Sequence, residues 1–298
     1  MTLNVDELLA EGRGRQLPRR EYRDGIELSI IGFGGIVVNG QEQPSGNDEV
    51  ARAVDRGVNY FDVAPAYNNG EAEIKLGIAL QPYRDQSFLA CKTGRRDAEG
   101  ARFELERSLE RLNTDHFDLY QFHAINLLED VEKILGVGGA METFLKARDE
   151  GMIRYIGFSA HSEEAALALL DRFPFDSVLF PINYVCYAQG KFGPGVIAKA
   201  QEIGAARLAL KGLAHSPWGE GNERSNPKTW YRPIDDESIM KQALRFTLSE
   251  PITAALPPGD ERLFRLAVDI GSAFVPLSPE ERASLVESTW ETEPIFSV

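Results

Sequence analysis

Four side chains suited to acid–base chemistry lie at the ends of three successive apolar segments. Asp62 closes the segment YFDVA, Lys92 closes LACKT, and His123 closes YQFHA. Tyr67 lies just beyond the first of these segments, in the loop PAYNNG. Neighbouring strands of a sheet lie about 4.8 Å apart, so side chains at the ends of adjacent parallel strands meet at one edge. We therefore expect the four side chains to converge.

The four residue types together indicate reduction of a carbonyl group. A buried lysine needs a counter-charge, and Asp62 is the nearest candidate. A lysine ammonium beside Tyr67 favours the phenolate, so it should lower the tyrosine pKa and make Tyr67 a usable proton donor. His123 would hydrogen-bond the substrate carbonyl and stabilise charge on its oxygen. No side chain supplies hydride, so a nicotinamide cofactor is required.

The elements that must position these residues alternate between strand and helix. Strands are predicted at 30–38, 59–64, 87–93, 117–124, 153–160, 177–183, 206–211 and 252–256, and helices at 46–57, 72–80, 99–112, 140–151, 162–173, 194–204, 238–249 and 260–270. Near-continuous apolar strands with a helix after each one indicate a parallel sheet that is buried on both faces. Eight such units favour a closed (β/α)8 TIM barrel, with an open doubly wound sheet as the alternative.

Two further patterns complete the predicted architecture. Asp24-Gly25 separates two β-prone runs within 19–30, which predicts an N-terminal β-hairpin with a type I′ turn. A stretch at 212–236, rich in Gly, Pro, Asn and Trp, is an insertion before the last helices. No Pro- or Ser-rich linker divides the chain, so we expect one domain over residues 1–298.

Composition narrows the class of protein. The chain has 298 residues and a formal net charge of −14, and a surface of that sign repels nucleic acid and anionic membranes. Cys91 and Cys186 have no metal-ligand spacing, and such sparse cysteine usage fits a reducing compartment. The N-terminal sequence lacks a secretory apolar region, and no window resembles a spanning helix. A soluble cytoplasmic protein without a metal site is expected.

Several stretches, in this order, resemble the aldo/keto reductase superfamily: NYFDVAPAYNNGEAEIKLGIAL, FLACKTG, ELERSLERLNTDHFDLYQFHA and EGMIRYIGFSAHS. The resemblance is closest over residues 26–161 and is traceable to about residue 270. It implies a catalytic tetrad of Asp62, Tyr67 as general acid, Lys92 and His123. It also implies a hairpin that plugs the bottom of the barrel.

The segments that bind the cofactor in that superfamily are altered here. The superfamily orients the nicotinamide carboxamide with a Ser-Asn pair, and this chain keeps Ser159 but has Ala160 in place of the Asn. Leu179 stands where a carboxamide-binding Gln is common, whereas Asn183 falls at a later Asn of the superfamily. Leu210 replaces the aromatic residue that stacks on the nicotinamide.

The remaining cofactor contacts are expected around residues 211 and 259–265. Lys211 could pair with the cofactor pyrophosphate as a point charge. The helix N-terminus near Gly259 would offer free N–H groups to a phosphate. Arg262 or Arg265 could hold an adenosine 2′-phosphate, which favours NADP, with NAD as the alternative.

The resemblance implies a small-molecule carbonyl or alcohol substrate, such as a sugar. Aromatic side chains of the insertion and of the C-terminal tail could wall its pocket; they are Trp218, Trp230, Tyr231, Trp290 and Phe296. Two other functions stay open. One is a nicotinamide-binding regulatory or sensor protein with little turnover, and the other is a barrel lyase or isomerase that uses Lys92 as a Schiff-base amine. The sequence gives no prediction of oligomeric state.

Overall fold

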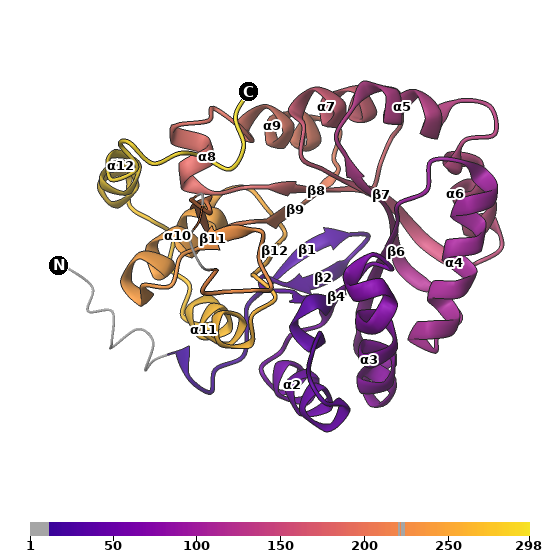
Figure 1. The fold of residues 1–298 in the computed structure, drawn as a ribbon, viewed down its shortest axis with the longest axis horizontal. Helices are drawn as coiled ribbons and strands as arrows, with labels where there is room; N and C mark the ends of the chain where they lie inside the picture. Colours follow the sequence, from indigo (N-terminus) through magenta and orange to yellow (C-terminus); the bar gives the residue numbers. More distant parts are fainter. Residues whose placement is uncertain (1–11, 220, 222–223) are drawn as a thin grey trace.

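The computed structural model describes residues 12–219, 221 and 224–298, and in this part of the chain eight parallel strands form one sheet in the order β12-β9-β8-β7-β6-β5-β4-β3. A parallel bridge between Ile31 and Ala255 joins the two edges. The Gly32 amide donates to the Ala255 carbonyl at 2.9 Å, and the Ala255 amide donates to the Ile30 carbonyl at 2.9 Å. The sheet is therefore closed, and helices ring it on the outside (Figure 1), which confirms the (β/α)8 barrel.

The bounds of the elements are as follows. The barrel strands are β3 (Phe33–Gly34), β4 (Tyr60–Asp62), β5 (Phe88–Thr93), β6 (Phe117–Ile125), β7 (Ile153–Ala160), β8 (Ser177–Pro181), β9 (Ala206–Leu210) and β12 (Ala254–Leu256). The helices between and after them are α2 (Gln43–Asp55), α3 (Glu71–Leu80), α4 (Ala98–Leu112), α5 (Leu128–Leu135), α6 (Ala140–Asp149), α7 (Glu163–Arg172), α8 (Tyr184–Ala188), α9 (Pro194–Glu202), α10 (Glu237–Ser249), α11 (Glu261–Ser272) and α12 (Pro279–Glu287).

The N-terminal hairpin closes one end of the barrel. Its strands β1 (Arg19–Arg23) and β2 (Ile26–Ser29) pair antiparallel and lie across the ring of strands in Figure 1. Tyr22 of β1 packs against Phe88 of β5, with ring centroids 4.9 Å apart. Asp24 has φ 53° and Gly25 has φ 77°, both in the left-handed region. Two successive positive φ angles are those of a type I′ turn, as predicted.

Apolar side chains fill two layers of the fold. Inside the barrel, Tyr60, Leu119 and Leu179 pack on the hairpin residues Tyr22 and Leu28. Side chains on the other face of the strands meet the helices in one large cluster, which includes buried Phe residues of β3, β4, β6, β7 and β8. Because both faces of each strand are covered, the strands read in the sequence as apolar runs.

Some elements differ from the prediction. Only Phe33–Gly34 of the segment 30–38 pair as a strand, and the chain then turns into the 3-10 helix η1 (Gly35–Val38). Two short 3-10 helices, η2 (Tyr67–Gly70) and η3 (Gln81–Gln86), flank α3. Helices α5, α8 and α12 were not predicted, and the insertion contains a hairpin of β10 (Ala214–Pro217) and β11 (Tyr231–Pro233).

Two expectations from the sequence concern export and membrane insertion. The N-terminal residues 1–11, where no secretory signal was predicted, lie outside the described residues. Among the helices that the structure describes, none combines the length and apolar character needed to cross a membrane.

Candidate active site

Lys92 and Asp62 form a buried ion pair at the mouth of the barrel. Their side chains are 1% and 2% exposed, and the Lys92 ammonium donates to the Asp62 carboxylate. Lys92 Nζ also lies 3.3 Å from the Val63 carbonyl oxygen and 3.4 Å from Tyr67 Oη. The adjacent strands β4 and β5 bring Lys92 and Asp62 together. Burial lowers the pKa of Lys92, but the charge and hydrogen bond of Asp62, together with Tyr67, outweigh burial and raise the pKa above its ordinary value.

Asp62 is held by two further donors, which sequence reasoning missed. Tyr60 Oη donates to Asp62 Oδ2 at 3.2 Å, and Gln121 Nε2 donates to the same oxygen at 3.0 Å. Tyr60 stands two residues before Asp62, and Gln121 stands two residues before His123. Alternate residues of a strand share a face, so this spacing was the available signal. The carboxylate is fixed in position as well as paired.

Tyr67 and His123 meet edge to face beside the lysine. Their ring centroids lie 5.8 Å apart, with an interplanar angle of 87°. The structure thus brings together all four side chains that were predicted to converge. Burial is the largest influence on Tyr67 and raises its pKa, although Lys92 opposes the rise. The expected fall in the tyrosine pKa was therefore wrong, because desolvation exceeds the attraction of the ammonium.

His123 is a neutral imidazole at physiological pH. Burial, followed by the charge of Lys92, lowers its pKa to about 3. A neutral ring keeps one N–H donor and one acceptor nitrogen. Lys92, in contrast, stays protonated because of its pairing with Asp62. An amine that attacks a carbonyl must be unprotonated, so this geometry disfavours the Schiff-base function for Lys92.

A small cavity of about 120 Å³ lies beside the tetrad. It reaches from Tyr67 and Asp62 to Gly259 at the start of α11. Its other lining residues are Gly34, Ile36, Leu179, Leu210, Lys211, Lys228, Thr229, Trp230, Tyr231, Leu256, Pro257 and Pro258. Ligand pockets typically hold about 300–1,000 Å³, so this cavity is narrow for a whole dinucleotide unless its walls move apart.

Lys211 belongs to this cavity and not to a solvated loop. It follows β9 with φ 64°, a left-handed conformation that is uncommon for lysine. Its Nζ lies 4.8 Å from the ring centroid of Tyr231 and 5.3 Å from that of Trp230. Burial, assisted by the charge of Lys92, lowers the pKa of Lys211 to about 8. Trp230 and Tyr231, two aromatic residues of the insertion, thus line the cavity, as expected.

Ser159 and Asn183 hold the local backbone. Ser159 Oγ accepts a hydrogen bond from the Ala124 amide at 2.8 Å. Asn183 caps α8, where its Oδ1 accepts from the Cys186 amide at 2.8 Å. Both side chains are buried, and neither lines the cavity. Ser159 retains a hydroxyl hydrogen to donate, whereas both ends of the Asn183 amide already have a partner in Cys186.

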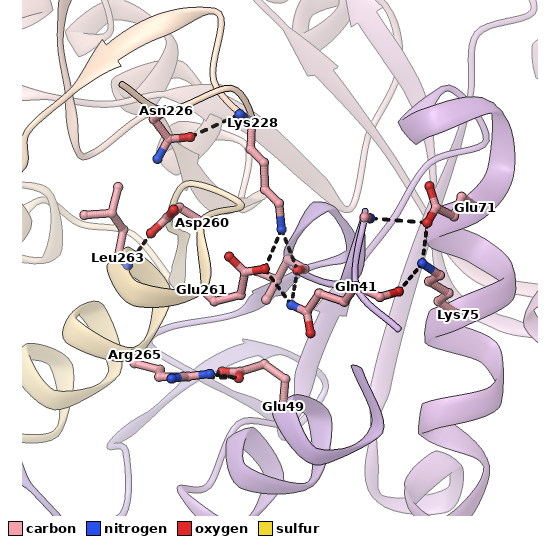
Figure 2. A network of polar contacts seen from close by, with 12 residues as sticks. Gln41, Glu49, Glu71, Lys75, Asn226, Lys228, Asp260, Glu261, Leu263 and Arg265 are labelled. Atoms are coloured by element: carbon pink, nitrogen blue, oxygen red, sulfur yellow. Dashed lines mark hydrogen bonds and ion pairs between the residues drawn. The ribbon is translucent and has the colours of Figure 1, made fainter. Parts of the chain in front are cut away.

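The expected phosphate site at the start of α11 is crowded. A Cβ on Gly259 would lie 2.3 Å from Ile36 Cγ2, so only glycine allows this approach. Asp260 caps α11 by accepting from the Leu263 amide at 2.9 Å. Arg265 is bound to the Glu49 carboxylate, with Arg265 Nε 3.0 and 3.1 Å from its oxygens (Figure 2). Arg262 lies on the exposed face of α11.

A polar clasp joins the insertion to the two segments beside the cavity. Lys228 Nζ donates to Glu261 Oε1 at 2.7 Å and to the Val37 carbonyl at 3.0 Å. Gln41 Nε2 donates to the same two oxygens at 2.8 and 2.7 Å. Figure 2 shows Lys228 reaching across from the insertion to Glu261 on α11, with the Gln41 side chain directed at the same carboxylate. Nothing in the spacing of these residues along the chain predicted their meeting.

Similar proteins match between 53% and 88% of the chain. The protein "Uncharacterized oxidoreductase YqkF" of Bacillus subtilis is 23% identical over 292 residues, which cover 88% of this chain and 93% of that protein. "Aldo-keto reductase YhdN" of the same organism is 35% identical over 176 residues, 53% of this chain and 51% of that protein. "L-galactose dehydrogenase" of Arabidopsis thaliana is 30% identical over 55% of this chain and 54% of that protein.

Solved structures support the same fold. The holo form of aldo-keto reductase AKR11C1 from Bacillus halodurans has a TM-score of 0.71 at 23% identity, covering 92% of this chain and 96% of that chain. An aldo-keto reductase from Klebsiella pneumoniae in complex with NADPH has a TM-score of 0.72 at 18% identity, covering 95% and 98%. The model of the Aldo/keto reductase family matches residues 30–228. The chain therefore belongs to the aldo/keto reductase family, which is a family of oxidoreductases.

Proposed function

We propose that the protein reduces an aldehyde or ketone to the alcohol, with Tyr67 as the general acid. The observation that carries the proposal is the contact of Lys92 Nζ with Tyr67 Oη at 3.4 Å, in a lysine whose charge is fixed by Asp62. The neutral His123 ring stands edge-on to Tyr67, with ring centroids 5.8 Å apart, so both side chains could reach one carbonyl oxygen. The reverse reaction, oxidation of an alcohol, uses the same groups.

Each member of the tetrad has a separate role in this mechanism. A bound nicotinamide supplies the hydride. Tyr67 gives its proton to the carbonyl oxygen, and the Lys92 ammonium stabilises the phenolate that remains. Asp62 keeps Lys92 charged and oriented. The neutral imidazole of His123 donates an N–H to the same oxygen, which orients the carbonyl and stabilises its developing charge. The raised pKa of Tyr67 keeps the proton in place until it is needed.

The residues present fit a nicotinamide dinucleotide along the cavity. Its apolar walls, Leu179 and Leu210, suit a flat ring beside Tyr67, and Gly259 leads to the N–H groups that begin α11. Ser159 can donate its hydroxyl hydrogen to the carboxamide, and Asn183 can donate the second hydrogen of its Nδ2 while its Oδ1 still caps α8. We propose NADP(H) as the preferred form; the relative from Klebsiella pneumoniae was solved with NADPH.

The 2′-phosphate of NADP would depend mainly on Arg262. This arginine is exposed and adjoins the start of α11, so it could reach a phosphate there. Arg265 would first have to break its ion pair with Glu49, whose side chain is buried. The narrow cavity also implies that the clasp of Lys228 opens when the dinucleotide enters.

The proposed function is tested by titrating the protein with NADPH and, separately, with NADH. Trp230 lines the cavity, so bound cofactor should quench tryptophan fluorescence. Simple aldehydes are then added, and absorbance of the reduced nicotinamide is followed. Quenching by NADPH and loss of that absorbance support the proposal. Tight binding without oxidation across a panel of carbonyls would favour a sensor protein, which the altered Ala160, Leu179 and Leu210 positions also suit. Binding of neither nucleotide would exclude both functions.

A further inference from the structure

We infer that the substrate carries an anionic group, a carboxylate or a phosphate, and that this group binds Lys211 Nζ. The inference rests on the proposed function, because it assigns a substrate class to the same site. Lys211 lines the cavity together with Tyr67 and Asp62, its Nζ lies over two other lining residues, Trp230 and Tyr231, and its backbone is left-handed. Such strain is typical of functional sites, where the surrounding structure maintains it.

Lys211 is the cavity lysine whose charge is left unbalanced. Lys92 is paired with Asp62, and Lys228 is paired with Glu261. Across residues 12–219, 221 and 224–298, no carboxylate forms an ion pair with Lys211. Its neighbours are the faces of Tyr231 and Trp230, at 4.8 and 5.3 Å. Aromatic faces attract an ammonium without neutralising it, so the cation remains available to an anion.

The ammonium also lies on the catalytic side of the cavity. The charge of Lys211 helps to lower the pKa of both His123 and His161, so it acts at the tetrad end. His161 stacks on Phe296 with ring centroids 5.1 Å apart, and Phe296 meets Trp230 at 5.7 Å. These rings pack behind Trp230, which lines the cavity beside Lys211. A small carbonyl compound with an acidic group at its far end matches that arrangement.

The C-terminal tail, which includes Phe296, is held against the segment between α8 and α9. The Val298 amide donates to the Gly190 carbonyl at 3.0 Å, and the C-terminus lies beside α8 and α9 in Figure 1. A Cβ on Gly190 would lie 2.2 Å from the Phe296 carbonyl oxygen, so the tail packs directly on the backbone there. Trp230, which lines the cavity, is thus backed by Phe296 of the tail, and Lys211 supplies the cation beside it.

The test compares substrates that differ in charge at one end only. One pair is 4-carboxybenzaldehyde and its methyl ester, and a second pair is glyceraldehyde 3-phosphate and glyceraldehyde. The variants are Lys211→Met, Lys211→Arg and the control Lys191→Met. Lys191 is exposed and also has a left-handed φ of 51°, so its variant carries the same backbone cost. Loss of a charged hydrogen bond should raise KM for the anionic substrates roughly 10- to 100-fold in Lys211→Met.

The neutral substrates should keep their KM in Lys211→Met, and Lys211→Arg should retain the preference for the anionic ones. A second readout needs no cofactor: 4-(hydroxymethyl)benzoate is titrated into the protein alone, with tryptophan fluorescence as the signal and benzyl alcohol as the neutral control. We expect Lys211-dependent binding of the carboxylate. If that binding occurs without any NADPH oxidation, the proposed function fails while the anion site stands.

Three results would overturn the inference. One is wild-type protein that does not bind 4-(hydroxymethyl)benzoate more tightly than benzyl alcohol. Another is a Lys211→Met variant that changes KM equally for charged and neutral substrates. The third is a variant that weakens NADPH binding but leaves the charged-to-neutral KM ratio unchanged, which would assign Lys211 to the cofactor pyrophosphate. In the last two cases turnover itself still supports the proposed reductase.

Discussion

Replacing Asp62 with asparagine should destabilise the protein far more than a typical polar substitution. The change leaves the Lys92 ammonium, 1% exposed, without a counter-charge. Breaking a buried ion pair from one side costs about 3–5 kcal/mol. A loss of 1 kcal/mol lowers the melting temperature of a chain of this length by about 2 °C. The Asp62→Asn variant should therefore melt roughly 6–10 °C below the wild type in a calorimetric scan.

The same reasoning predicts that a second substitution restores stability. Lys92→Met removes the unpaired ammonium, and the asparagine introduced at position 62 can still accept from Tyr60 and Gln121. Replacing both partners of a buried pair is often close to neutral. The double variant should therefore melt well above Asp62→Asn alone, within roughly 4 °C of the wild type. If the double variant instead loses as much stability as the two single variants lose together, the idea that the two charges depend on each other is refuted.

Three more results follow from the site. Removing the clasp with Lys228→Met should speed cofactor release roughly tenfold in stopped-flow fluorescence, because one charged hydrogen bond to Glu261 is lost; unchanged release would exclude the clasp as a gate. Arg262→Ala should raise the Kd of NADPH roughly tenfold and leave that of NADH unchanged; an equal effect on both would remove this arginine from the 2′-phosphate. His123 and His161 have pKa values of about 3 and about 4, below the ordinary 6.5, so their stabilising effect is complete above about pH 6.5 and is lost as pH falls towards 3. The free energy of unfolding, obtained from melting curves, should be lower at pH 5 than at pH 7 by roughly 1–2 kcal/mol per histidine. The double variant with glutamine at positions 123 and 161 should show a correspondingly smaller difference between the two pH values.

The barrel and the tetrad could be predicted because each leaves a periodic signal in the sequence. Strands covered on both faces read as apolar runs, so a charged residue at the end of such a run, such as Asp62 or Lys92, stands out. Asp24-Gly25 predicted the hairpin turn because few residue pairs accept two positive φ angles. Helix α5 carries a comparable period in Leu128, Val131 and Ile134, but α6 follows it within the same strand-to-strand crossover, where the strand–helix alternation predicts a single helix.

The remaining features depend on contacts between distant segments. The clasp joins Gln41, Lys228 and Glu261, which lie far apart in the sequence and meet only when the barrel closes. Lys211 could be placed after a strand, but its direction follows from a left-handed φ that no local motif indicates. The pKa of Tyr67 was predicted with the wrong sign because the sequence shows a nearby lysine but not the extent of burial. The conformation of Lys211 and the desolvation of the Tyr67 hydroxyl are both properties of the folded chain.

The most direct test of the central claim is the single-turnover reduction of an aldehyde by the Tyr67→Phe variant loaded with NADPH. The substitution removes only the hydroxyl that lies 3.4 Å from Lys92 Nζ and leaves the ring against His123. Loss of a general acid should slow the chemical step roughly 100- to 10,000-fold, while the fluorescence titration with NADPH stays unchanged. A variant that binds NADPH normally and reduces the aldehyde at a rate within a few-fold of the wild type would contradict the assignment of Tyr67 as the proton donor.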